Sequence, residues 1–122
     1  MKILGIGNAI VDVICKVNDS FIDQNNLTKS TMKLFFDENE FKDLLTNLKI
    51  EKTVSGGSVA NSIVGLSQLG DKVGFIGKVS EDDFGKKYEE GLKKENVEYF
   101  YSKKKEELPT GTCLILVTPD SE

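Results

Sequence analysis

Residues 56–70 read GGSVANSIVGLSQLG and place a glycine pair and a polar amide at the start of an apolar segment. Glycine has no Cβ, so at Gly56 and Gly57 the backbone is free to turn with a positive φ, and a ligand is able to approach the main chain closely. The first N–H groups of a helix lack intrahelical partners and would point towards such a ligand. The segment therefore predicts a helix whose start forms a binding site, although a helix cap without a ligand explains the same residues.

Two polar side chains accompany the glycine pair. Asn61 falls within the first helical turn, where its amide both donates and accepts hydrogen bonds, as the hydroxyls of a sugar ring require. Ser58 either faces the ligand or caps its own helix. The rest of the helix is apolar nearly all round and is predicted to be buried. Its apolar residues are Val59, Ala60, Ile63, Val64, Leu66 and Leu69.

Apolar runs that are typical of strands lie on both sides of this helix. Residues 2–7 show little alternation between apolar and polar residues, as expected for a strand buried on both faces of a parallel sheet. Residues 73–79 and 112–118 are further predicted strands. Ligand sites in open α/β sheets form beyond the carboxyl ends of strands, so Asn8 and Asp12, which follow the first strand, are candidate binding residues.

Asp12 is the leading candidate for direct ligand contact. An ionised carboxylate offers two oxygens to two neighbouring hydroxyls, and a cis-diol presents donors at a matching separation. The alternative is a carboxylate in a surface loop without a ligand.

Two further helices are predicted from capping residues and apolar spacing. Asp37 followed by Glu40 has the spacing of a capping box, and apolar residues recur behind it at helical intervals. Ser80 followed by Asp83 predicts the start of another helix, which carries Tyr88 on its apolar face. Residues 97–102 alternate apolar and polar side chains, as a strand exposed on one side does.

Composition narrows the class of protein. A chain of 122 residues with 39% hydrophobic and 30% charged residues is typical of one globular domain. A net charge of −4 argues against nucleic acid as a partner, and the basic run 103–105 is followed at once by two glutamates. Two distant cysteines and no histidine predict no metal site. Polar residues interrupt the apolar N-terminus, so we expect no signal peptide, no membrane partner and a cytoplasmic location.

Two common nucleotide-binding motifs are excluded. The glycines at positions 5 and 7 follow a strand, but Ile10 occupies the third position of the dinucleotide fingerprint, where a bulky side chain blocks helix packing. The chain also lacks the glycine-rich loop with Lys-Ser/Thr of P-loop proteins.

Four motifs in order resemble the PfkB-type carbohydrate and nucleoside kinases, with the adenosine kinases most similar among them. They are GIGNAIVD (5–12), GGSVAN (56–61), GKVSEDDFG (77–85) and PTGTC (109–113). The resemblance implies an α/β fold of the ribokinase type, with a parallel sheet flanked by helices and a small β lid. One kinase domain over 1–122 is expected, with lid strands within 13–35 and 97–104 and no second domain.

The resemblance also implies roles for individual residues. Asp12 would hold two sugar hydroxyls and Asn61 a further one, while the backbone of Gly56 and Gly57 closes that side of the site. Asn8 would shape the strand end, with Ile10 packing nearby.

Ser58 and the segment Pro109 to Cys113 favour a nucleoside. By the resemblance Cys113 would line a base pocket, although a single cysteine in an apolar strand is also explained by packing. The implied substrate is adenosine, phosphorylated on its 5′-hydroxyl; a sugar kinase and a non-catalytic ligand-binding module are the alternatives. A homodimer held through the lid is the assembly that the resemblance implies.

One departure from the family concerns catalysis. The resemblance implies a later Gly-Ala-Gly-Asp type motif, and the chain contains none. We therefore expect an N-terminal portion of a kinase, inactive by itself and without catalytic residues. The sites for ATP and Mg²⁺ would lie beyond residue 122.

Overall fold

The computed structural model describes residues 2–35 and 37–121, which form two compact units. The first consists of Met1–Asp12 and Thr53–Cys113, and the second of Val13–Lys52 and Leu114–Glu122. Strands β2 (Ile10–Lys16), β3 (Ile50–Gly56) and β6 (Thr112–Val117) pair in the order β3-β2-β6. The expectation of one domain over 1–122 stays a prediction.

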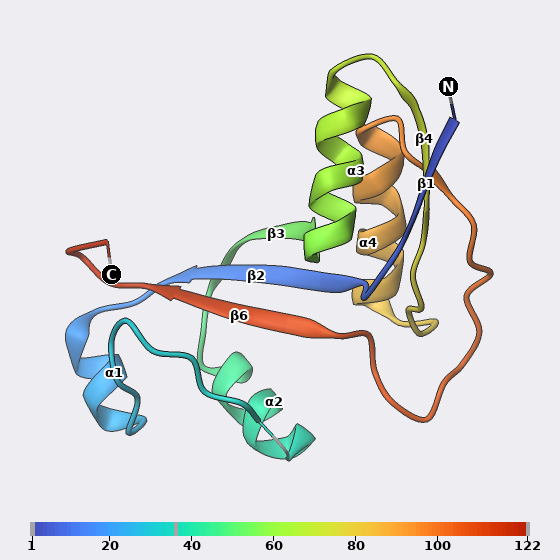
Figure 1. Ribbon diagram of the computed structural model, residues 1–122. Coiled ribbons are helices and arrows are strands. Elements are labelled where there is room, and N and C mark those ends of the chain that lie inside the picture. Colours follow the sequence, from blue (N-terminus) through green and yellow to red (C-terminus); the bar gives the residue numbers. More distant parts are fainter. Residues whose placement is uncertain (1, 36, 122) are drawn as a thin grey trace. The chain divides into compact units, whose positions relative to one another are not determined.

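The first unit contains a parallel sheet with two helices (Figure 1). Strands β1 (Lys2–Ile6) and β4 (Lys72–Ile76) pair in parallel along their whole length, and the short β5 (Glu98–Tyr99) continues the sheet beyond β4. Helix α3 (Ser58–Gln68) packs on β1 and β4, and α4 (Asp83–Lys94) packs on β5. This arrangement confirms the predicted α/β fold class.

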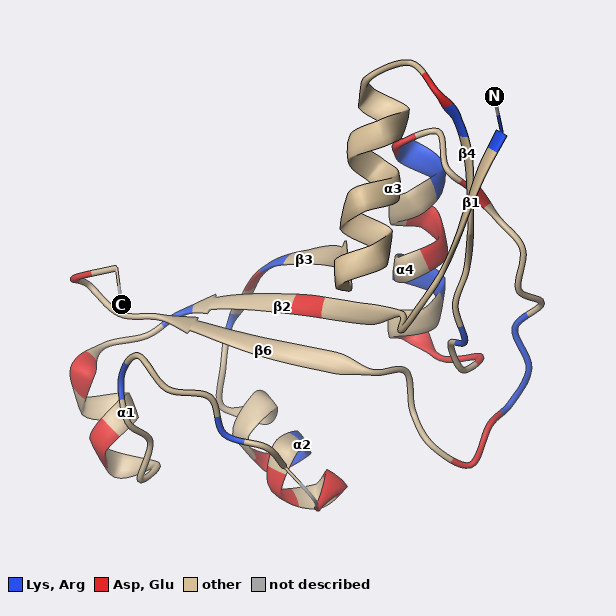
Figure 2. Cartoon of the chain, in the orientation of Figure 1, with Lys and Arg blue, Asp and Glu red and all other residues tan. Residues whose placement is uncertain are grey.

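An aromatic cluster anchors α4 to the sheet. Phe75 and Tyr88 are fully buried. Their ring centroids lie 6.2 Å apart, and that of Tyr99 lies 6.5 Å from Phe75 and 6.1 Å from Tyr88. Leu92, one turn after Tyr88, is also fully buried. Figure 2 shows α3 without charged residues, whereas α4 carries both signs, so α4 presents its polar face to water.

β1 and α3 are less buried than the sequence predicted. Gly5 of β1 faces Ile63 of α3, so Leu4 and Ile6 point to the opposite face of the strand and are 54% and 70% exposed. Of α3 only Ala60 and Ile63 are buried. The composition of β1 and α3 is that of elements buried on all sides. Within the described chain, however, each of the two packs along one face only.

A lid strand within 97–104 stays a prediction, but two residues of this range, Glu98 and Tyr99, form β5 in the structure. They pair in parallel with β4, and the N–H of Phe100 donates to Phe75 O at 3.0 Å. The alternation of apolar residues is the same for a lid strand and for a sheet edge, so periodicity did not distinguish them. Residues 13–35 hold the end of β2 and then α1 (Asp19–Gln24). That residues 13–35 contribute a lid strand stays a prediction.

Helix α4 begins later than predicted. Its N-cap is Asp82 rather than Ser80, because Asp82 Oδ1 accepts the N–H of Gly85 at 2.7 Å. Ser80 is buried and its N–H donates to Thr110 Oγ1 at 3.0 Å instead. The strand before it also ends early, at Ile76 rather than at position 79.

The second unit holds α1 and α2 (Glu38–Thr46). Asp37 caps α2 as predicted, with its carboxylate accepting from the N–H of Asn39 at 2.8 Å. Lys29 lies 2.5 Å from Asp19 and 2.7 Å from Asp120, and its hydrogen bond lowers the pKa of Asp120 to about 2. Over the described ranges, no helix has the length and apolar character needed to cross a membrane.

Candidate functional site

Asp12 lies in the middle of β2, with its side chain half-buried. Burial raises the pKa of its carboxyl group, because the charged form loses water. Within residues 2–35 and 37–121, no group forms a hydrogen bond or an ion pair with this carboxylate. A half-buried acceptor without a protein partner is available to hydroxyl donors of a ligand.

The glycine pair borders this carboxylate. A Cβ added to Gly56, the last residue of β3, would lie 2.9 Å from Asp12 Cγ, so only glycine fits there without displacing the carboxylate. Gly57 has φ +101°, and a Cβ at that position would overlap the carbonyl oxygen of Asn8. The predicted positive φ is confirmed at Gly57. At Gly56, glycine is needed only because the Asp12 carboxylate lies so close to the backbone.

The start of α3 follows directly. Gly57 is the N-cap residue and no described side chain caps the first turn, so the interpretation of Ser58 as a cap is wrong. The N–H of Asn61 donates to Gly57 O at 2.9 Å. The side chains of Ser58 and Asn61 are exposed. Neither the oxygen nor the nitrogen of the Asn61 side-chain amide is paired with another described side chain. Asn61 is therefore free to bind a ligand hydroxyl.

The remaining predicted residues are Asn8, which precedes β2, Ile10, which begins β2, and Cys113 in β6. The carbonyl of Asn8 meets Gly57, and Ile10 Cγ1 is 3.9 Å from a Cβ placed on Gly111. The N–H of Val11 donates to Gly111 O at 2.8 Å, which joins β2 to the PTGTC segment. The structure thus places all eight predicted positions in one unit, while their contact with a ligand stays a prediction.

Cys113 is exposed as a whole residue, but the partial burial of its thiol, together with the charge of Asp12, raises the pKa of that thiol. Because the thiolate is the reactive form, alkylation of Cys113 should be slow at about pH 8 and still accelerate above pH 9.0, the ordinary value. Asp12→Asn removes the charge, so the pKa should fall and alkylation at about pH 8 should become faster. Mass spectrometry over a pH series measures both rates.

Cys15 serves as the internal control in that experiment, because it is fully buried and should stay unmodified in the folded protein. A Cys113 rate that is the same in wild type and in Asp12→Asn would contradict the proximity of the two groups.

Tyr88 supports the glycine pair and was missed as a site residue. Its hydroxyl donates to Gly56 O at 3.2 Å, and Ser55 Oγ donates to Tyr88 O at 2.8 Å. Helical spacing assigned Tyr88 to the core, which is correct, but no sequence signal indicated which carbonyl its hydroxyl would reach.

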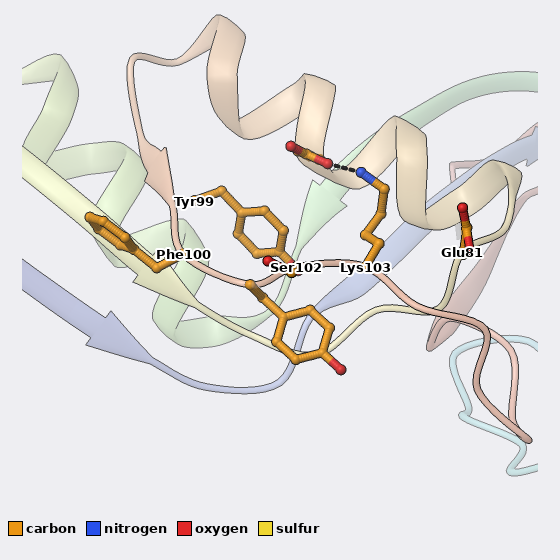
Figure 3. Close-up of a pocket in the computed structure, with 7 residues that line it drawn as sticks. Glu81, Tyr99, Phe100, Ser102 and Lys103 are labelled. Carbon is orange, nitrogen blue, oxygen red and sulfur yellow. Dashed lines mark hydrogen bonds and ion pairs between the residues drawn. The ribbon is translucent and has the colours of Figure 1, made fainter.

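A hollow of about 630 Å³ is lined by Glu81, by Glu89 of α4 and by the segment 99–103 (Figure 3). None of the eight predicted residues lines it. Its Lys103 and Glu89 pair with each other, as the dashed line in Figure 3 shows, so two of the three charged residues that line the hollow already have a partner. The unpaired Asp12 carboxylate is the stronger evidence for a ligand site. The lining residues of the hollow are Glu81, Glu89, Tyr99, Phe100, Tyr101, Ser102 and Lys103.

The described residues do not fit a metal ion. No three Cys, Asp or Glu side chains in the described ranges converge on one point. A single carboxylate such as Asp12 is suited to hydroxyl groups rather than to Mg²⁺, which is bound through carboxylates together with phosphates. We therefore assign no Mg²⁺ ion to these residues.

Comparison with known proteins identifies the family of this chain. The profile of pfkB family carbohydrate kinases matches residues 6–122. The chain belongs to the PfkB family. The resemblance seen in the four sequence motifs is thereby confirmed, and it extends over nearly the whole chain.

Solved PfkB-type structures share the fold of this chain. A probable sugar kinase from Rhizobium etli CFN 42 has a TM-score of 0.81 and 34% identity, over 98% of this chain and 36% of its own. The adenosine kinase from Sinorhizobium meliloti has a TM-score of 0.80 and 31% identity, with the same coverage of 98% and 36%. The ribokinase-type fold is therefore confirmed.

Curated relatives match over shorter stretches. A 5-dehydro-2-deoxygluconokinase from Clostridium botulinum (strain Eklund 17B / Type B) is 64% identical over 42 residues, which cover 34% of this chain and 12% of that protein. The enzyme of the same name from Mesomycoplasma hyopneumoniae (strain 232) is 39% identical over 69 residues, 57% of this chain and 20% of its own. The chain thus matches a fifth or less of these PfkB relatives and about a third of the solved structures.

Proposed function

We propose that the site around Asp12 binds a small polyhydroxylated substrate, which the full-length protein phosphorylates from ATP. The observation that carries this proposal is the Asp12 carboxylate, half-buried and without a described partner, with Gly56 fitted against it. Family membership supports the reaction class.

The site offers complementary groups for hydroxyls. The two Asp12 oxygens accept from adjacent hydroxyls, and the exposed Asn61 amide donates to or accepts from a third. Partial removal of Asp12 from water strengthens its hydrogen bonds, because fewer water molecules compete for the same oxygens. Positioning of the substrate is the contribution of this chain to phosphoryl transfer.

Two substrates are supported by different observations. The relatives named 5-dehydro-2-deoxygluconokinase support a keto sugar acid as the first candidate. The adenosine kinase from Sinorhizobium meliloti, 31% identical over 98% of this chain, supports adenosine as the second. ATP with Mg²⁺ is the phosphate donor that family membership implies.

A substrate panel on the full-length protein tests the proposal. With ATP and Mg²⁺ present, we expect kcat/KM for 5-dehydro-2-deoxygluconate to exceed those for ribose, fructose and adenosine by about a hundredfold, since groups built to bind a given hydroxyl pattern reject analogues that lack it. Release of ADP is the measurement.

The other outcomes have distinct meanings. Preference for adenosine would establish the second candidate. Binding in calorimetry without turnover would favour a non-catalytic ligand-binding module. Neither binding nor turnover with any compound would contradict the proposal.

A further inference from the structure

Asp82 forms more hydrogen bonds than a helix cap needs. Its Oδ1 accepts from the N–H of Gly85 at 2.7 Å and from Thr110 Oγ1 at 2.6 Å, and its Oδ2 accepts from the N–H of Thr110 at 2.8 Å. Burial by itself would raise the pKa of this carboxyl group, but the bonds from Thr110 and Gly85 outweigh it and hold the pKa below its usual value. Both oxygens of the carboxylate are therefore in use.

A cap alone would not require a carboxylate. Serine, asparagine and aspartate cap helices about equally well, because one oxygen that accepts one N–H is sufficient. Asp37 of α2 shows this simpler case, since its carboxylate accepts from the nearby Asn39. Two of the three bonds of Asp82 instead reach Thr110, which lies 28 positions away.

Thr110 transmits this restraint to the strand of the candidate site. It is only 3% exposed, and its hydroxyl accepts from the N–H of Ser80 at 3.0 Å as well as donating to Asp82. The next residue, Gly111, accepts from the N–H of Val11 at 2.8 Å. Val11 directly precedes Asp12, so the position of Thr110 bears on the backbone at the carboxylate.

We propose that Asp82 is a positioning residue for the candidate site: by holding Thr110, it keeps Gly111 in place against the strand that carries Asp12. Its effect on substrate affinity rests on the proposed function, whereas its effect on the backbone at Gly111 does not.

Asp82→Asn separates the cap from the positioning role. Asparagine keeps an oxygen for Gly85, but its NH₂ group is unable to accept from the N–H of Thr110. In the full-length protein we expect the amide of Val11 to exchange with deuterium about tenfold faster or more, because its acceptor is less firmly held. The amide of Asn61, bonded to Gly57 in the same unit, should exchange as in wild type.

Affinity is measured on the same variants by calorimetry, with the substrate that the panel identifies. Asp82→Asn should weaken binding about tenfold, since small displacements of positioned groups have large effects. Asp37→Asn is the matched control, because it changes the same residue type at a cap without a bond to Thr110. It should leave both Val11 exchange and affinity unchanged.

Two variants of Thr110 keep the test decisive if Asp82→Asn fails to fold. Thr110→Val retains the N–H but loses the hydroxyl, and should also speed Val11 exchange and weaken binding. Thr110→Ser retains both groups and should behave as wild type.

Unchanged Val11 exchange in the folded Asp82 and Thr110→Val variants would overturn the assignment, and so would faster exchange without weaker binding. If the wild type binds no compound of the panel, the proposed function fails by itself. In that case faster Val11 exchange still supports the link from Asp82 to Gly111, and unchanged exchange overturns it.

Discussion

Asp12→Ala in the full-length protein is expected to lower kcat/KM about a hundredfold or more, with little change in Tm. Hydrogen bonds to a charged acceptor contribute about 1.5 to 3 kcal/mol each, and this carboxylate is proposed to accept two of them from the substrate. Stability should hold because no described group is bonded to the carboxylate and its burial disfavours the charge. Steady-state kinetics and thermal melting measure the two effects.

The Asp12 carboxyl group also predicts the direction of a stability change. Its pKa is raised in the folded protein. This group therefore makes the fold less stable at neutral pH, where it is charged, than at acid pH, where it is protonated. Asp12→Asn removes that charge and should leave Tm equal or slightly higher while activity falls.

Asp71→Ala, which removes an exposed carboxylate after α3, is the control and should keep kcat/KM within about threefold. A comparably small loss in Asp12→Ala would show that Asp12 has no ligand role. A substrate analogue that lacks one bound hydroxyl sharpens the test. If the Asp12 carboxylate binds that hydroxyl, removing the hydroxyl should lower kcat/KM less in Asp12→Ala than in wild type. Additive losses would mean that the carboxylate does not contact that hydroxyl.

Gly56→Ala is expected to reduce both activity and stability. The added methyl group would lie 2.9 Å from Asp12 Cγ, so the carboxylate or the end of β3 must shift. Overpacking of this kind costs about 1 to 3 kcal/mol of stability, and displacement of the carboxylate should lower kcat/KM about tenfold or more. Denaturant unfolding and steady-state kinetics provide the measurements.

Gly65→Ala is the matched control, since an added Cβ there, inside α3, has no described atom within 4 Å. Alanine stabilises a helix interior by about 0.5 to 1 kcal/mol relative to glycine, so this variant should be at least as stable as wild type. Combining Gly56→Ala with Asp12→Ala should restore stability but not activity, because the shorter side chain removes the overlap. A double variant whose stability loss equals that of Gly56→Ala would exclude this overlap as the cause.

The parts of the fold that sequence predicted are those governed by local chemistry. The capping residue Asp37, the apolar face with Tyr88 and the positive φ of Gly57 each depend on neighbours in the chain, and all three are confirmed. The cap of α4 was misplaced because three acidic residues, 81–83, follow Ser80, and spacing did not show which carboxylate also meets Thr110.

Burial and strand pairing were harder to predict, since both depend on what lies opposite. The apolar residues of β1 and α3 are typical of elements covered on all sides, yet Ile6 of β1 is 70% exposed and Leu69, the C-cap of α3, is 83% exposed. The alternation of apolar and polar residues in 97–102 fits any strand with one solvent-exposed face. Only the pairing with β4 identified β5 as part of the sheet. Periodicity reports the environment of a side chain, not the partner of a backbone.

Sequence by itself determined the family, the fold class and the eight candidate positions, because glycines, a carboxylate and an amide at fixed spacings already restrict the backbone and its chemistry. Tertiary structure alone decided that Gly56 faces Asp12, that Tyr88 holds the Gly56 carbonyl, and that Asp82 reaches Thr110. These contacts join residues from 28 to 44 positions apart along the chain. Hydrogen bonds and close packing act over a few ångströms, and distant residues come that near only when the whole unit has folded.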